Sequence, residues 1–172
     1  MGTLVARSTK RGYIEINMMH EAGGAGLDRV TDQELSAWRL FIQTHVKIIE
    51  SIEQDLAEQK RVPLTTYDVL IELFEAPNKK LRLGDLTKKV ILTKSGLTRL
   101  VDRMEREGLL RREKSEEDKR GAYAVLTEAG ENELRRAWPV YAQGIKKYFA
   151  MPLAEKDLLA LKQALEMLSE QD

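Results

Sequence analysis

Apolar residues recur every three or four positions along much of the chain, which is the spacing of one face of a helix. The first such stretch runs from Leu35 to Leu56 and favours a single long amphipathic helix over about residues 32–59. Thr31 or Asp32 can cap this helix, because a side-chain oxygen can accept its first unpaired backbone N–H groups. We therefore expect a long helix near the start of the folded part of the chain.

Three further helices follow from the same spacing and from the positions of the prolines. Prolines rarely continue a helix, so they mark its ends or bend it. The pattern predicts helices over 67–75, over 127–149 with a kink at Pro139, and over 154–168. These segments make the expected fold class mainly α.

Residues 81–130 add strands to this mainly helical pattern, because two short helical segments are followed by short apolar segments with a different period. Residues 85–92 and 93–105 are predicted to form two helices, the second ending before Gly108. Segments 109–113 and 122–127 are predicted to be strands on either side of a charged turn. The expected order is helix, helix, strand, charged turn, strand.

The second of these helices separates two kinds of side chain. Its apolar residues fall on one side, and its polar residues include hydroxyl and cationic groups that suit phosphates and base edges. The apolar set is Leu97, Leu100, Val101 and Met104, and the polar set is Lys94, Ser95, Thr98, Arg99 and Arg103.

The distribution of charge along the chain favours a polyanionic partner, although the net charge does not. The 172 residues carry a net charge of zero, but the stretch 76–104 contains eight lysines and arginines against two aspartates. Clustered positive charge is expected of a surface that binds phosphates. A lysine-rich surface in contact only with water is the alternative.

Composition narrows the class of protein. A hydrophobic content of 42% is that of a folded globule, and no apolar run is long enough for a membrane helix. The N-terminus lacks an apolar signal region, so we expect a cytoplasmic protein with no membrane partner. The absence of cysteine excludes disulfides and sensing by a thiol.

Three sequence features together resemble the multiple-antibiotic-resistance regulator (MarR) family of bacterial winged-helix transcription factors. They are the helix phrase 95–105, the pair Asp118 and Arg120, and the phrase 125–130. The resemblance extends from about residue 32 to 167. It implies a winged helix-turn-helix over 61–127 with a small β-hairpin wing, and N- and C-terminal dimerisation helices over 31–60 and 128–172. Residues 1–30 are then a flexible N-terminal extension to a domain at 31–172.

The resemblance also implies which residues contact DNA. The recognition helix would meet the groove and the phosphates, and the hairpin tip would place a cation in the minor groove. An ordinary amphipathic helix and a hairpin whose charges meet only water are the alternatives. The DNA-contacting residues implied by the family are Thr93, Lys94, Ser95, Thr98, Arg99, Arg103, Asp118, Lys119 and Arg120.

The family often binds small aromatic or phenolic acids between the long first helix and the winged helix. In this chain the resemblance places Trp38, Phe41, His45 and Tyr67 in such an effector pocket. Aromatic residues at helical spacing can equally form part of the core.

Enzyme chemistry finds no support in the sequence. The two histidines, His20 and His45, are far apart, and no set of residues at metal-ligand spacing or glycine-rich phosphate loop is present. We expect no cofactor and no metal. The sequence thus predicts a sequence-specific, ligand-responsive repressor that binds a pseudo-palindromic DNA operator as a homodimer. A winged-helix module that binds protein is the alternative.

Overall fold

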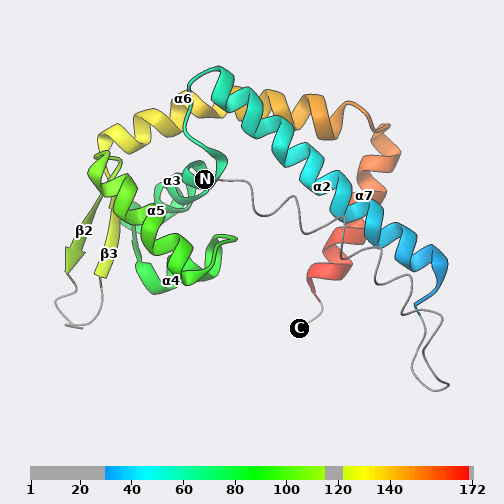
Figure 1. The fold of residues 1–172 in the computed structure, drawn as a ribbon, viewed down its shortest axis with the longest axis horizontal. Helices are drawn as coiled ribbons and strands as arrows, with labels where there is room; N and C mark the ends of the chain where they lie inside the picture. Colours follow the sequence, from blue (N-terminus) through cyan, green and yellow to red (C-terminus); the bar gives the residue numbers. More distant parts are fainter. Residues whose placement is uncertain (1–29, 115–121, 171–172) are drawn as a thin grey trace. The chain divides into compact units, whose positions relative to one another are not determined.

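The computed structural model describes residues 30–114 and 122–170, and most of them are helical (Figure 1). A small antiparallel sheet lies among the helices. The elements are α2 (Asp32–Glu58), α3 (Leu64–Glu75), a 3₁₀ turn η1 (Pro77–Lys79), β1 (Lys80–Arg82), α4 (Leu83–Lys89), α5 (Lys94–Arg106), β2 (Leu110–Lys114), β3 (Ala122–Leu126), α6 (Glu128–Ile145), a π-helical turn η2 (Lys146–Ala150) and α7 (Glu155–Ser169). The predicted order of helix, helix, strand and strand is confirmed by α4, α5, β2 and β3.

The chain divides into two compact units, Met1–Phe41 and Ile42–Asp172, with the boundary inside α2. In the first unit, Thr31 and Glu34 form a reciprocal cap. The Thr31 hydroxyl accepts the Glu34 backbone N–H at 3.2 Å, and the Glu34 carboxylate accepts the Thr31 backbone N–H at 2.6 Å. The hydrogen bonds from Thr31 hold the pKa of Glu34 below its usual value. The predicted cap at Thr31 is confirmed.

The core of the second unit forms around α3. This helix buries one continuous face, and residues of α4, α5 and the sheet close over it. The largest side chains with almost no exposed surface are Leu56, Leu70, Leu73, Leu86, Met104 and Leu110. The winged-helix part therefore has its own hydrophobic core, which gives α5 a rigid support.

The start of α3 lies three residues before the predicted start at Tyr67. Its first backbone N–H group, that of Leu64, donates to the Glu53 carboxylate at 3.0 Å. A carboxylate at this end is favoured because the unpaired N–H groups of a helix N-terminus carry partial positive charge. The stabilising group comes from α2, so the local sequence around Pro63 could not reveal it.

The sheet has three strands, in the order β1-β3-β2, with both pairs antiparallel. Arg82 faces Tyr123 across the first pair, and Glu113 faces Tyr123 across the second. The predicted hairpin is therefore present, but the sheet also contains a third strand, β1, that was not predicted. The additional strand β1 has only three residues, too few to show the alternation by which a strand is recognised in a sequence.

The helix α6 continues through Pro139 and ends at Ile145, where the backbone widens into the π-helical turn η2. The expected helix to residue 149 is thus divided at 145. Near this end, α6 approaches α2 closely, because a Cβ atom on Gly144 would lie 2.8 Å from Cγ1 of Ile52. The Tyr148 hydroxyl donates to Asp55 at 3.1 Å and joins η2 to α2.

Candidate nucleic-acid interface

The N-terminal end of α5 is exposed and carries unpaired hydrogen-bond donors. The Thr93 hydroxyl accepts the Gly96 backbone N–H at 3.1 Å, as expected of an N-cap residue. The side chains of Thr93, Lys94 and Ser95 are exposed. The remaining N–H groups of the first turn, the partial positive charge of the helix end and the Lys94 ammonium together favour a phosphate at this position.

The two faces of α5 divide as the sequence predicts. Leu97, Leu100, Val101 and Met104 are buried, and Thr98 and Arg99 are exposed. Within the ranges 30–114 and 122–170, the side chains of Lys94 and Arg99 form no ion pair and no hydrogen bond. These two cations are therefore available to an anionic partner.

Arg103 lies at the edge of the polar face and contacts α3. Its guanidinium donates to the hydroxyl of the buried Thr66 at 3.1 Å and lies 3.9 Å from the Glu107 carboxylate. The sequence assigned Arg103 the same role as Arg99. The structure separates them, because Arg103 already joins two helices while Arg99 extends from the exposed face.

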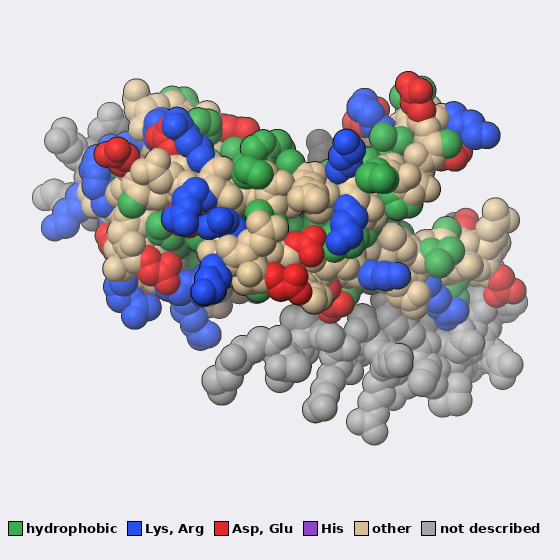
Figure 2. Space-filling view, turned by 90° about the horizontal axis from the view of Figure 1, so that it is seen from above, with side chains coloured by type: hydrophobic (Ala, Val, Ile, Leu, Met, Phe, Trp, Pro, Cys, Tyr) green, Lys and Arg blue, Asp and Glu red, His purple; other side chains and the backbone are tan. Residues whose placement is uncertain are grey.

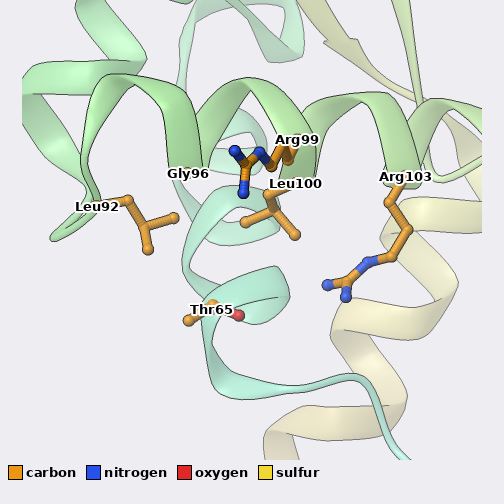
Figure 3. Close-up of a pocket in the computed structure, with 6 residues that line it drawn as sticks. All are labelled: Thr65, Leu92, Gly96, Arg99, Leu100 and Arg103. Atoms are coloured by element: carbon orange, nitrogen blue, oxygen red, sulfur yellow. The ribbon is translucent and has the colours of Figure 1, made fainter. Parts of the chain in front are cut away.

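A hollow of about 250 Å³ lies between α5 and the start of α3. Figure 3 shows Arg99 and Arg103 on the same side of α5, above Thr65 of α3. The remaining wall is formed by Leu92, Gly96 and Leu100. Two guanidinium groups at one hollow make a cationic site that suits a phosphate or another small anion.

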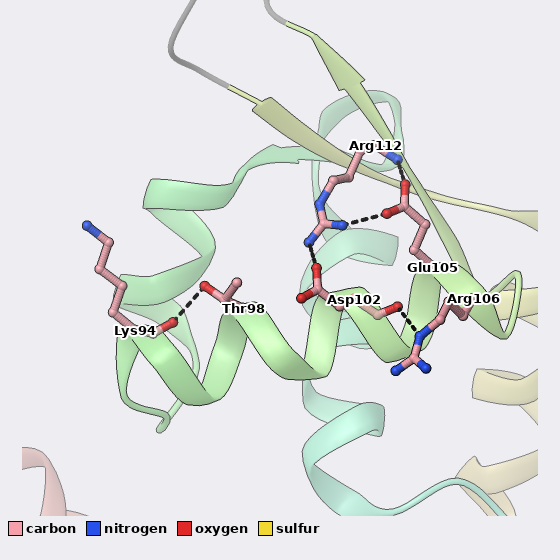
Figure 4. Close-up of polar contacts among 6 residues, drawn as sticks. All are labelled: Lys94, Thr98, Asp102, Glu105, Arg106 and Arg112. Atoms are coloured by element: carbon pink, nitrogen blue, oxygen red, sulfur yellow. Dashed lines mark hydrogen bonds and ion pairs between the residues drawn. The ribbon is translucent and has the colours of Figure 1, made fainter.

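Arg112 of β2 connects the sheet to α5 (Figure 4). Its guanidinium donates to Asp102 and to Glu105 at 2.5 Å each, and its backbone N–H donates to Glu105 at 2.9 Å. Partial burial lowers the pKa of Arg112, but the hydrogen bonds to the two carboxylates outweigh this and raise it. The network neutralises two acidic groups next to the exposed face of α5 and ties β2 to this helix.

None of the three residues of this network was among the site residues predicted from the sequence. Alternation along β2 was the available signal, because successive side chains of a strand point to opposite faces. Arg111 therefore points to the outer face, where it pairs with Glu113, and Arg112 points to α5. Which of the two arginines meets the helix becomes clear only when the strand is placed.

The outer face of the sheet carries further cations. Glu113 accepts a hydrogen bond from Lys80 at 2.6 Å, and the hydroxyl of Tyr123 accepts one from Arg82 at 3.0 Å. The Lys80 ammonium also lies 4.4 Å from the centre of the Tyr123 ring, a cation–π distance. The predicted tip residues Asp118, Lys119 and Arg120 lie outside the described residues.

The four predicted effector residues lie in different surroundings. Trp38 and Phe41 are exposed, with ring centres 6.1 Å apart, and His45 is exposed. Tyr67 is buried, and its ring packs edge-on against Tyr141 at 4.8 Å. Burial raises the pKa of the Tyr67 hydroxyl to about 12.

The described part of the chain contains no group of three or more histidine, cysteine or acidic residues placed to hold a metal ion. None of its helices combines the length and apolar character needed to cross a membrane.

Comparison with known proteins identifies the relatives of this chain. A model of the MarR family matches residues 62–121. The crystal structure of AbsC, a MarR family transcriptional regulator from Streptomyces coelicolor, matches with a TM-score of 0.75 and 33% identity, over 84% of this chain and 97% of AbsC. That of Sco3205, a MarR family regulator from the same organism in complex with DNA, matches with a TM-score of 0.77 and 28% identity, over 86% and 92%. The transcriptional repressor MprA of Escherichia coli K12 is 27% identical over 128 residues, 74% of this chain and 72% of MprA.

Proposed function

Because the chain belongs to the MarR family of transcriptional regulators, we propose that it binds a pseudo-palindromic DNA operator as a homodimer and represses transcription. The observation that carries the proposal is the exposed face of α5, where Lys94 and Arg99 have no partner among the described residues. DNA supplies both the phosphates and the base edges that these groups can bind. The DNA complex of Sco3205 and the repressor function of MprA support the same proposal.

The geometry suggests how α5 would bind. An α-helix fits the major groove, and a recognition helix commonly reads bases with its N-terminal residues. Lys94 and the first-turn N–H groups would hold a phosphate, and Ser95, Thr98 and Arg99 would face the bases. Arg112 would keep Asp102 and Glu105 from repelling the phosphates. The proposed role of Arg120 in the minor groove rests on the sequence alone.

Selection of bound duplexes from a random DNA pool tests the proposal directly. A homodimer should select a site with two-fold symmetry, because its half-sites mirror the symmetry of the protein. Recovery of an unrelated set of sequences would contradict sequence-specific binding. It would favour the alternative, a winged-helix module that binds another protein.

Arg99→Ala should weaken binding to the selected operator by about 1–3 kcal/mol if Arg99 reads a base, and it should relax the preference at one position of each half-site. If Arg99 contacts phosphate, binding should weaken evenly on all sequences with a shallower dependence on salt. Fluorescence anisotropy at several salt concentrations distinguishes the two. Arg136→Ala is a matched control, since Arg136 is an exposed arginine of α6 paired with Glu133. Unchanged affinity of Arg99→Ala would remove Arg99 from the interface.

The homodimer is proposed because α7 leaves much of its apolar surface uncovered. Leu159, Met167 and Leu168 are exposed. An apolar groove of about 720 Å³ runs along the helix between Phe149 and Ser169 and is lined by Leu158, Leu159 and Leu165. Hydrophobic side chains also lie between charged ones on the face shown in Figure 2. A second copy of the chain would cover α7, as expected of an interface built from an exposed apolar helix.

Removal of residues 154–172 should therefore give a monomer or an aggregate with greatly reduced operator binding. A milder variant, Leu159→Glu with Leu165→Glu, places charges in the groove without shortening the chain. Sedimentation equilibrium measures the oligomeric state, and replacement of the exposed Lys156 by glutamate is the control for added negative charge on α7. A truncated protein that stayed dimeric and bound the operator would argue against α7 as the interface.

We also propose that a small aromatic anion releases the operator. Burial, followed by repulsion from Glu53 and Glu72, raises the pKa of the Asp68 carboxyl to about 6. The same carboxylates disfavour an anion beside the neighbouring Tyr67. The hollow at Arg99 and Arg103 suits an anion better, and a ligand there would compete with DNA for Arg99. Displacement of labelled operator by benzoate measures this competition, and operator that stays fully bound would contradict an anion site at the hollow.

A further inference from the structure

Ile91 lies in the turn between α4 and α5, and its relative exposure is 96%. It is the most exposed large hydrophobic residue in the described part of the chain. Its two neighbours are anchored differently, because Val90 is buried in the core and Leu92 is half-buried. An isoleucine held outside the core at this position has no role in the packing of the helix-turn-helix.

The backbone holds Ile91 at the tip of a tight turn. The Leu92 backbone N–H donates to the Val90 carbonyl at 2.8 Å, which closes a three-residue turn with Ile91 at its centre. The turn is anchored by the packing of Val90 on one side and by the N-cap of α5 at Thr93 on the other. The side chain of Ile91 is therefore presented to solvent by a defined conformation and not by a disordered loop.

Lysines flank Ile91 on both sides in the sequence. Lys88 and Lys89 end α4 and Lys94 begins α5, so three ammonium groups lie within three residues of Ile91 in the sequence. Lys88 pairs with Asp85 and Lys89 with Glu72, while Lys94 has no partner within the described ranges. A partner that covers this apolar side chain would therefore also meet the unpaired ammonium group of Lys94.

DNA meets both requirements in the major groove. It is a polyanion, and the C5-methyl group of thymine is an apolar group on its base edges. The turn leads directly into the exposed N-terminal end of α5, the part of a recognition helix that commonly contacts bases. A role for Ile91 in base preference rests on the proposed DNA-binding function and adds to it.

We propose that Ile91 is a specificity-determining residue that packs against a thymine methyl group in each operator half-site. The contact excludes water from both apolar groups, so it favours thymine over cytosine and over uracil at that position. Arg99 and Ile91 then read different bases, one through hydrogen bonds and the other through apolar contact.

Replacing each thymine of the selected operator by deoxyuridine, one symmetric pair at a time, tests the proposal. This change removes only the methyl group. For the wild-type protein, the replacement at one symmetric pair of positions should weaken binding by about fourfold for each half-site, as expected for the loss of one buried methyl-sized group. Ile91→Ala should weaken binding to the thymine operator by a similar factor and should no longer distinguish thymine from deoxyuridine there. Ile91→Val should retain part of the preference.

Two measurements show whether the loss of affinity in Ile91→Ala arises at the contact between Ile91 and the thymine methyl group. Met151→Ala is the control, because Met151 is also an exposed apolar residue but lies outside the helix-turn-helix. Sedimentation of Ile91→Ala should give the same oligomeric state as the wild type, and a weaker dimer would identify a second copy as the partner of Ile91 and overturn the proposal. If Ile91→Ala lost the same affinity on the thymine and the deoxyuridine operators, or no affinity on either, the proposal would also be overturned. A wild-type protein that selected no operator would instead refute the proposed function.

Discussion

Gly130→Ala should lower the free energy of unfolding by about 3 kcal/mol, the upper part of the range for adding a methyl group to a tightly packed site. A Cβ atom at Gly130 would lie 2.0 Å from the backbone oxygen of Leu109 and 2.8 Å from Cδ1 of Leu126. Gly130 lies in the first turn of α6, and Leu109 lies directly before β2. The substitution would therefore separate the start of α6 from the sheet.

Neither neighbour of Gly130 can yield easily. The Leu109 carbonyl accepts the Thr127 backbone N–H at 3.2 Å, and the Gly108 carbonyl accepts the Thr127 hydroxyl at 2.6 Å. A shift of α6 and its N-cap Thr127 away from Leu109 would weaken both hydrogen bonds. Gly130 is required here by the close approach of two backbones and not by an unusual backbone angle.

Urea unfolding followed by circular dichroism, at fixed protein concentration, measures the effect. Gly84→Ala is the matched control, because a Cβ atom at this helical glycine would have no neighbour within 4 Å. It should leave stability unchanged or raise it by up to about 1 kcal/mol, since alanine favours a helix more than glycine does. Equal stability of the two variants would show that the contact at Gly130 can relax.

Arg112→Ala should weaken operator binding by about 1–2 kcal/mol, which is less than for a fully buried ion pair, because the side chains of Arg112, Asp102 and Glu105 are partly exposed and water screens their charges. The substitution leaves Asp102 and Glu105 without their shared cation. Two uncompensated carboxylates would then repel the phosphates, and the sheet would lose its link to α5. Both effects act on DNA binding more strongly than on the core.

Arg111→Ala removes the same charge from the neighbouring position of β2 and is the matched control. Arg111 pairs with Glu113 on the outer face of the sheet, away from α5. Operator binding measured for both variants should separate the role of the network from a general loss of positive charge. An Arg111→Ala defect as large as that of Arg112→Ala would mean that net charge, and not the link to α5, governs affinity.

Combining Asp102→Asn and Glu105→Gln with Arg112→Ala provides a further check. These changes remove the unpaired negative charges and keep the side-chain shapes. Recovery of most of the affinity would assign the defect to repulsion of phosphates. A persistent defect would assign it to the lost orientation of the sheet against α5.

The sequence by itself determined the features that depend on residues close together in the chain. The amphipathic pattern of α5 involves contacts over three or four positions, so periodicity and residue type were sufficient to predict it. The capping pair Thr31 and Glu34 is local in the same way. The family resemblance likewise depended on short phrases, 95–105 and 125–130.

Only the tertiary structure decided which of the predicted groups are available to a partner. Arg99 and Arg103 are equivalent in the sequence pattern, but the hydroxyl of Thr66, 37 positions from Arg103, distinguishes them. The strand β1 forms because it pairs with β3, and α3 starts early because Glu53 of α2 accepts its first N–H group. Each of these contacts joins segments that are distant in the chain. Their free energy depends on how the helices pack, and no local pattern of residues contains that information.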